Sequence, residues 1–115
     1  MHEFSLAGEV LKLAESEAIK NKAVSVSEIN IEIGNLSGVE AEAFESAMKI
    51  VAENSVLENT VINIIRIRGK GICGICNKEY EMDRRIDTCP ECHELPSEIR
   101  GGKEFRVVSL LVEKE

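Results

Sequence analysis

The sequence predicts an α+β fold, with two helices packed on a small three-stranded sheet and a smaller domain inserted before the last strand. Two observations predict this class. Apolar residues recur at intervals of three and four in two segments, whereas in three other segments they alternate with polar residues or cluster in β-branched runs. Between the last two of these segments lies a stretch that holds all four cysteines, both prolines and the only tyrosine. A chain of 115 residues is long enough for one compact domain that carries a satellite.

The two helical segments have recognisable starts. The first runs from Phe4 to about Lys22, with Ser5 as its predicted N-cap. Its predicted buried stripe consists of Phe4, Ala7, Leu11, Ala14 and Ala18, with Val10, Leu13 and Ile19 beside it. The second helix follows Ser37, which forms with Glu40 the spacing of a capping box. Its predicted stripe consists of Phe44, Ala47, Met48 and Val51.

Three segments have strand patterns. Ile29, Ile31 and Ile33 alternate with polar residues and predict a half-buried strand that ends at Gly34-Asn35. A β-branched run from Val61 to Ile67 predicts the second strand. The third, Phe105 to Val112, is apolar at both odd and even positions, which favours a central place in the sheet.

The stretch from Gly69 to Gly102 differs in composition from the rest of the chain. Its 34 residues begin and end with glycine pairs, which suit hinges or tight exits, and they include few aliphatic side chains. So short a segment with so little to bury needs a metal or a cross-link to fold. We therefore predict an α+β domain of residues 1–68 plus 103–115, and an inserted domain of residues 69–102.

The cysteines in this insert have the spacing of a metal site. Cys73-Gly-Ile-Cys76 and Cys89-Pro-Glu-Cys92 are separated by twelve residues, enough for a short hairpin whose Tyr80 and Met82 can pack over the site. Two residues between cysteines let both thiolates of one turn face the same ion, and two such turns complete a tetrahedron around Zn²⁺. Four thiolates leave no open coordination position, so the predicted zinc is structural and the insert is a zinc ribbon.

The cysteine pattern also fits other kinds of site. A rubredoxin-like iron site uses similar ligands and stays open. Cys89-Pro-Glu-Cys92-His93 satisfies a haem-attachment pattern, but that interpretation leaves the first cysteine pair unexplained, and a thioredoxin-like motif would not expect a second pair. His93 is either a solvated loop residue or an alternate zinc ligand that exchanges with a thiolate as the pH changes.

Charge and composition exclude several function classes. The formal net charge is −7 and aromatic residues make up 3% of the chain, which disfavours nucleic acid as a partner. No signal-peptide pattern and no apolar run of membrane-spanning length is present, so we expect a cytoplasmic protein with no membrane partner. In that reducing compartment, four cysteines favour a metal site over two disulfides.

The N-terminus has its own metal chemistry. A histidine at position 2 places its imidazole, its backbone nitrogen and the α-amine of Met1 within reach of one ion. Deprotonated amide nitrogens together with imidazole favour the square-planar geometry of Ni²⁺ or Cu²⁺. Glu3 can add a carboxylate or its own backbone nitrogen. The alternative is an N-terminus that is frayed and without function.

Motifs along the whole chain resemble one family. Met1-His2-Glu3 with Ser5-Leu6, the run Ile33-Gly-Asn-Leu-Ser-Gly-Val-Glu40, the paired C-x-x-C motifs and a last strand ending Leu111-Val112-Glu113 are similar to the HypA/HybF family of nickel metallochaperones. The resemblance implies delivery of Ni²⁺ to the apo large subunit of [NiFe]-hydrogenase, with the GTPase HypB as partner. It also implies that Met1-His2-Glu3 carries nickel through the terminal amine, the His2 imidazole and backbone nitrogens. The four cysteines would hold structural zinc.

The resemblance also bears on Glu40 and on the residues that follow the first cysteine pair. In related proteins an acidic residue in the loop lies near the nickel, and Glu40 matches it; the alternative role of Glu40 is the acidic arm of the Ser37 capping box. Some relatives carry a second histidine after the first cysteine pair, where this chain has Asn77 and Lys78. Any ligand exchange at the zinc would therefore depend on His93 alone.

The predicted function is that of a carrier and not of an enzyme. The sequence shows no serine–histidine–acid set, phosphate-binding loop or open zinc site. The alternative from another class is a zinc-ribbon adaptor between proteins that has no nickel role. A zinc-ribbon binder of nucleic acid is disfavoured because residues 69–102 carry 5 basic and 7 acidic side chains. The oligomeric state stays open, and a homo-oligomer is one of the states considered.

Overall fold

The computed structural model describes residues 2–114. Its elements, in chain order, are α1 (Glu3–Lys20), β1 (Ser25–Gly34), α2 (Ala41–Ala52), β2 (Val61–Ile67), β3 (Gly69–Cys73), β4 (Glu79–Met82), β5 (Pro96–Arg100) and β6 (Phe105–Glu113). The chain divides into two compact units. The first comprises residues up to 31, 40–65 and from 106 onward, and the second comprises 32–39 and 66–105.

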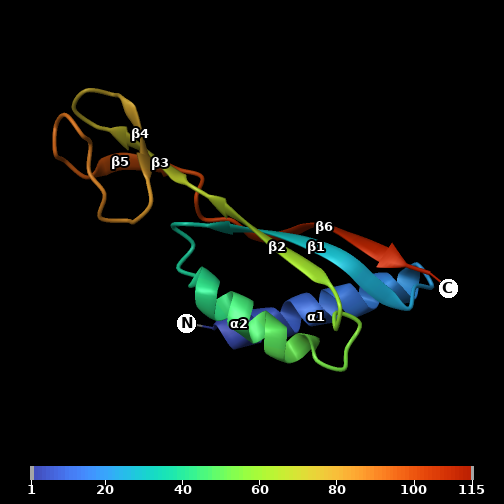
Figure 1. Cartoon of the computed structure of the whole chain (residues 1–115). Helices are drawn as coiled ribbons and strands as arrows, with labels where there is room; N and C mark the ends of the chain where they lie inside the picture. The colour runs from blue at the N-terminus through green and yellow to red at the C-terminus, as the bar shows by residue number, and fades with distance from the viewer. Residues whose placement is uncertain (1, 115) are drawn as a thin grey trace. The chain divides into compact units, whose positions relative to one another are not determined.

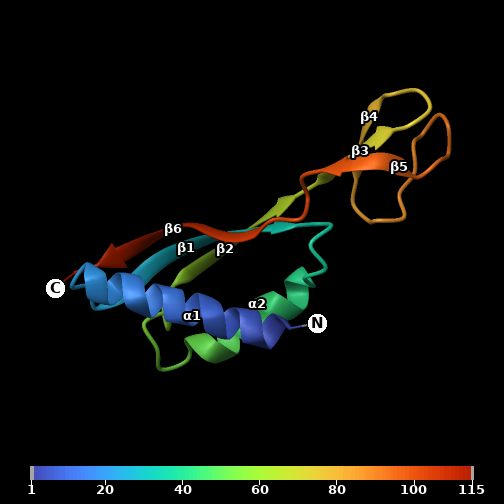
Figure 2. The same cartoon turned by 180° about the vertical axis from the view of Figure 1, so that it is seen from behind.

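The first sheet has the strand order β2-β1-β6, and both helices lie on one of its faces (Figures 1 and 2). Backbone hydrogen bonds show that β1 and β6 are antiparallel, because Val24 N–H donates to Glu113 C=O at 2.8 Å and Gly34 N–H donates to Glu104 C=O at 2.6 Å. The predicted α+β class, with two helices on a three-stranded sheet, is confirmed.

The central strand of this sheet is β1, so the prediction that the third strand is central was wrong. β6 lies at the edge. Its apolar residues do not reflect burial on both faces, because Val108 is 44% exposed and Leu111 56% exposed. In contrast, Ile29, Ile31 and Ile33 of β1 are fully buried. Apolar content alone therefore misplaced β6.

The start of α1 differs from the prediction. The helix begins at Glu3 with His2 as N-cap, three residues before Leu6, the first helical residue that a Ser5 cap would allow. The His2 carbonyl accepts the first intrahelical hydrogen bond, from Leu6 N–H at 2.8 Å. The His2 side chain makes no capping hydrogen bond. Glu3 is thus the first residue of the helix and follows His2 directly.

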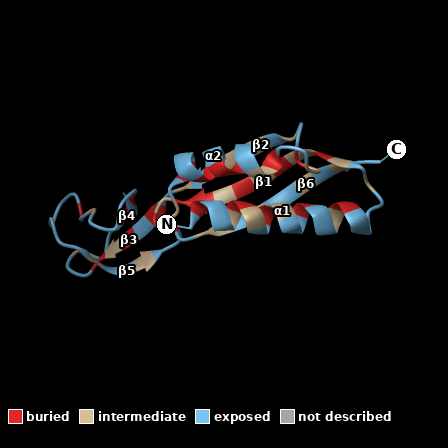
Figure 3. Cartoon of the chain, turned by 90° about the horizontal axis from the view of Figure 1, so that it is seen from below, coloured by how far each residue is buried: buried red, intermediate tan, exposed pale blue. Residues whose placement is uncertain are grey.

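The predicted buried stripe of α1 is confirmed at Ala7, Ala14 and Ala18 and was wrong at Phe4. The buried residues are Glu3, Ala7, Val10, Ala14 and Ala18, and Figure 3 shows them along one side of the helix. Phe4, which was predicted to be buried, is 59% exposed. The physical reason is that the Glu3 carboxylate accepts a hydrogen bond from the backbone N–H of Glu40. This bond turns Glu3 inward, and the next residue therefore points to solvent.

The predicted capping box of α2 is absent. The helix begins at Ala41 with Glu40 as N-cap, and the Glu40 side chain makes no capping hydrogen bond. Ser37 Oγ instead accepts a hydrogen bond from Val39 N–H at 3.1 Å, and Gly38 has φ +84°. A left-handed residue cannot belong to a right-handed helix, so the helix starts after it. The predicted stripe is confirmed for Phe44, Ala47 and Met48.

The second unit contains an antiparallel sheet with the order β4-β3-β5. Its core joins Leu36, Cys73, Tyr80, Met82 and Cys89, so Tyr80 and Met82 do pack against cysteines as predicted. The hairpin expected within the twelve-residue spacer was wrong: the spacer contains one strand, β4, whose partner β3 precedes it, so the hairpin encloses the first cysteine turn. The inserted ribbon of the predicted fold class is thus confirmed. The domain boundary at residues 68–69 and 102–103 stays a prediction.

The glycines at the ends of this ribbon form a tight crossing. A Cβ on Gly102 would overlap Gly69 Cα and lie 2.8 Å from Gly69 N, and Gly102 has φ +82°. Leu36 N–H donates to Gly102 C=O at 2.7 Å. Of the two roles predicted for these glycines, the close packing of backbones supports the tight exit.

Neither helix of residues 2–114 is both long and apolar enough to cross a membrane.

Candidate metal centres

The four cysteines converge on one point. The Sγ atoms of Cys73, Cys76, Cys89 and Cys92 all lie within 4.8 Å of one another, and this group is the only such metal-ligand cluster found within residues 2–114. Cys76 Sγ lies 3.8 Å from Cys89 Sγ. Zinc–sulfur bonds of about 2.3 Å in a tetrahedron place neighbouring sulfurs roughly 3.8 Å apart. The donor set and its spacing therefore fit an ion such as Zn²⁺.

Both cysteine turns have the same backbone design. Asn77 N–H donates to Cys73 C=O at 2.9 Å, and His93 N–H donates to Cys89 C=O at 2.8 Å. Asn77 and His93 have φ +60° and +58°, so they occupy equivalent left-handed positions in the two turns. The His93 side chain is exposed and is not among the four residues whose ligand atoms gather. The structure therefore gives His93 a backbone role, which the sequence analysis missed.

The thiols of Cys73 and Cys92 differ in pKa when no metal is bound. Backbone N–H groups of Cys76 and Ile75 donate to the Cys73 sulfur and lower the pKa of that thiol. A hydrogen bond to the Cys76 thiol raises the pKa of Cys92. One thiolate is thus available to meet an ion near neutral pH, and binding must displace the remaining protons.

The N-terminal candidates lie in the first unit. His2 is exposed, and Met1 lies outside the described residues. Glu3 is only 8% exposed, and its Oε2 accepts a hydrogen bond from Glu40 N–H at 3.0 Å. This bond lowers the pKa of the Glu3 carboxyl. The structure therefore brings Glu3 to the backbone of Glu40, a contact between residues 37 positions apart.

The sequence analysis treated Glu3 only as a nickel ligand and missed its structural contact. A signal was available, because Glu3 continues the buried series Ala7, Val10, Ala14 and Ala18 by one helical turn. The Glu40 side chain is exposed. Its backbone carbonyl accepts a hydrogen bond from Phe44 N–H at 2.9 Å, and this bond closes the first turn of α2.

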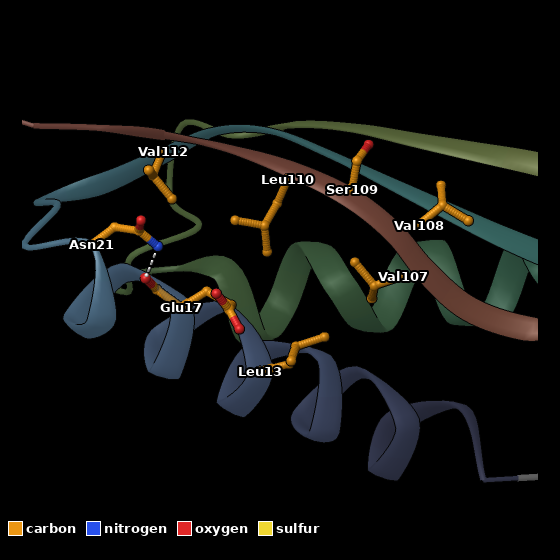
Figure 4. Close-up of a pocket in the computed structure, with 8 residues that line it drawn as sticks. All are labelled: Leu13, Glu17, Asn21, Val107, Val108, Ser109, Leu110 and Val112. Atoms are coloured by element: carbon orange, nitrogen blue, oxygen red, sulfur yellow. Dashed lines mark hydrogen bonds between the residues drawn. The ribbon is translucent and has the colours of Figure 1, made fainter.

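A groove of about 400 Å³ lies between α1 and β6 (Figure 4). Glu17 is the one carboxylate among the residues that line it. Asn21 Nδ2 donates to the Glu17 backbone carbonyl at 2.8 Å at one end. A single carboxylate does not make a metal site, so this groove is not a candidate metal centre.

Comparison with known proteins decides the family. Residues 1–112 match the family described as hydrogenase/urease nickel incorporation metallochaperone HypA. The chain belongs to the HypA family. Hydrogenase maturation factor HypA of Francisella philomiragia is 38% identical over 111 residues, which cover 96% of this chain and 98% of that protein. Its counterpart in Parabacteroides distasonis is 37% identical over the full length of both chains.

The fold agrees with solved HypA structures. The solution structure of the Ni metallochaperone HypA from Helicobacter pylori matches with a TM-score of 0.67 and 27% identity, and the match covers 100% of both chains. The predicted resemblance to nickel metallochaperones is thus confirmed. HypA proteins are described as metallochaperones and maturation factors, which are functions of metal transfer and not of catalysis.

Proposed function

We propose that this chain carries Ni²⁺ at its N-terminus and delivers it to the apo large subunit of [NiFe]-hydrogenase in the cytoplasm, with HypB as partner. The proposed ligands are the α-amine of Met1, the His2 imidazole, and backbone nitrogens of His2 and Glu3. Membership of the nickel-incorporation family supports this assignment. The observation that carries it is the anchoring of Glu3 to Glu40, which orders the turn next to the proposed site.

The start of α1 suits amide coordination. The first N–H groups of an α-helix have no acceptor within the helix. Amide nitrogens of His2 and Glu3 can therefore lose their protons to a metal without breaking a helical hydrogen bond, since the first such bond starts at Leu6. Two deprotonated amides also offset the charge of Ni²⁺, which removes the repulsion between a bare cation and the positive end of the helix dipole.

Glu3 contributes through its backbone nitrogen in this proposal. Its carboxylate is buried and already accepts the Glu40 amide, which leaves it poorly placed to bind an exposed ion. The exposed carboxylate of Glu40 is a better candidate for a nearby anionic group. Glu40 is thus proposed to lie beside the nickel, as the resemblance implied.

The cysteine centre is proposed to hold a structural Zn²⁺ through Cys73, Cys76, Cys89 and Cys92. Four thiolates close the coordination shell, and the ion holds together the inserted domain of residues 69–102. His93 stays a proposed alternate ligand only if the backbone of its turn rearranges, because its side chain does not join the cluster. A homo-oligomer remains compatible with this assignment.

Nickel titration of the untagged protein tests the proposal. A site built from an amine, an imidazole and amides should bind with Kd about 1 µM and weaken at acidic pH as these groups take up protons. His2→Ala should lower the affinity at least tenfold and leave the zinc content unchanged. His93→Asn, which removes the other histidine, is the matched control and should bind nickel as the wild type does.

Unchanged nickel affinity in His2→Ala would overturn the N-terminal site. One tightly held zinc without nickel uptake in the wild type would favour the zinc-ribbon adaptor. One residue added before Met1 should also weaken nickel binding, because it displaces the α-amine from the histidine.

A further inference from the structure

We infer that Lys78 and Glu91 are positioning residues of the cysteine centre: their ion pair joins the two cysteine turns and slows the loss of the metal bound between them. This inference rests on the proposed zinc at the four cysteines. Lys78 follows the first turn, residues 73–77, whereas Glu91 lies inside the second, residues 89–93. Lys78 Nζ donates a hydrogen bond to Glu91 Oε1 at 2.5 Å, across 13 positions of the chain.

The sheet already joins the two turns on one side. β3 leads into the first turn and β5 follows the second, and the two strands pair with Cys73 opposite Pro96. Ser97 Oγ also donates to Ile72 C=O at 3.1 Å. Backbone pairing therefore joins the start of the first turn to the residues after the second. The ion pair joins the end of the first turn to the middle of the second.

The backbone of Lys78 is tied to a ligand of the centre. Its carbonyl accepts a hydrogen bond from Cys73 N–H at 3.0 Å. The second turn repeats this contact, because Cys89 N–H donates to Glu94 C=O at 3.0 Å. Since one hydrogen bond connects Lys78 to Cys73, an ion pair that fixes Lys78 also restrains that ligand. Lys78 and Glu91 thus act through the turns and not by binding the ion.

The size of the effect follows from the exposure of the pair. The side chains of Lys78 and Glu91 are 60% and 58% exposed, so solvent and salt screen their attraction. Loss of the metal requires the turns to separate, because each turn supplies two of the four cysteines. The ion pair opposes this separation. Its removal should raise the dissociation rate of the metal about two- to fivefold, the range expected for an exposed ion pair.

Transfer of zinc from the full-length zinc-loaded protein to an excess of a chromogenic chelator tests the inference. Lys78→Gln and Glu91→Gln should each release zinc about two- to fivefold faster than the wild type, and the double variant no faster than either single variant. Lys78→Arg keeps the cation and should release zinc at the wild-type rate. In about 1 M NaCl the differences should disappear, because salt screens an exposed ion pair.

Lys70→Gln is the matched control. Lys70 Nζ lies 3.4 Å from Glu79 Oε1 in the same ribbon, and their side chains are 52% and 47% exposed. This variant therefore loses the same charge and an ion pair of similar exposure. The Lys70–Glu79 pair joins β3 to β4 and not the two turns, so the control should release zinc at the wild-type rate.

The two single variants separate the ion pair from a general effect of charge. A general effect would make Lys78→Gln release zinc faster and Glu91→Gln slower, because one removes a cation and the other an anion near four thiolates. That result, or equal release rates in the wild type and both variants, would overturn the inference. A wild type that binds no zinc would overturn the proposed zinc centre and the inference with it. Failure of nickel binding would overturn only the proposed nickel site and leave the zinc-release result valid.

Discussion

Gly101 and Gly102, at the end of the ribbon, allow a test of the close backbone contact between Gly102 and Gly69. Gly101 and Gly102 have φ +66° and +82°, so an alanine at either position is strained by about 1–2 kcal/mol. Their surroundings differ. A Cβ on Gly101 would meet only Glu104 Oε2, at an ordinary 3.6 Å, whereas a Cβ on Gly102 would overlap the backbone of Gly69.

The two substitutions should therefore differ in magnitude. Relief of the overlap requires the two backbones to separate, at a cost of about 1–3 kcal/mol for overpacking. The same movement stretches the 2.7 Å hydrogen bond between Leu36 N–H and Gly102 C=O, worth about 1 kcal/mol. We expect Gly102→Ala to lower the free energy of unfolding by about 3–6 kcal/mol and Gly101→Ala by about 1–2 kcal/mol.

Thermal unfolding of the zinc-saturated variants measures the difference. For a chain of 115 residues, a loss of 1 kcal/mol lowers Tm by about 4 °C. Gly102→Ala should thus lower Tm by about 12–24 °C and Gly101→Ala by about 4–8 °C. Because the chain has two compact units, the unfolding is followed both by helical circular dichroism and by zinc release. Equal losses in the two variants would show that only backbone strain matters and would refute the crossing argument.

Four further predictions follow from single residues. Gly8→Ala should raise the free energy of unfolding by about 1 kcal/mol in urea denaturation, because Gly8 lies within α1 and a Cβ there meets nothing within 4 Å. Tyr80→Phe should be neutral or stabilise by about 1 kcal/mol in the same assay, since the buried Tyr80 hydroxyl has no hydrogen-bond partner in the described structure; a clear loss would show that this hydroxyl has a partner in solution. His93→Asn should keep the stability of the second cysteine turn, whereas His93→Ala should lower Tm, because φ +58° suits asparagine better than alanine. The contribution of Glu3 depends on pH: its carboxyl pKa is lowered by the Glu40 amide, so the stabilisation is complete above the ordinary value of 4.5 and is lost as the pH falls through the lower folded value. The Glu40 amide chemical shift should follow this titration in the wild type and not in Glu3→Gln.

Local patterns in the sequence predicted the elements well where burial follows a simple period. The β-branched run Val61–Ile67 is a strand with the predicted bounds, and the alternation of Ile29, Ile31 and Ile33 marks the buried face of β1. The spacing of the cysteines predicted a convergent four-sulfur site because two residues between ligands is a local geometric requirement. Such features depend on neighbours in the chain, which a sequence displays directly.

The N-terminal region shows where local patterns were insufficient. Ser5 and Ser37 have the residue types of helix caps, but neither helix begins at them. A contact across 37 positions, from Glu3 to the Glu40 amide, sets the start of α1 and its buried face. The left-handed Gly38 delays α2. Neither a distant partner nor a φ value can be read from local spacing.

The spacing of the cysteines by itself predicted that four sulfur atoms gather at one point, and the motifs along the chain predicted its family. Only the tertiary structure decided what surrounds these features. It put β1 and not β6 at the centre of the first sheet, gave His93 a left-handed backbone position, and seated Leu36 among the cysteines. The physical reason is that metal-ligand spacing and apolar periodicity are properties of short segments. Strand order and packing partners depend instead on the free energy of burying surfaces that belong to distant parts of the chain.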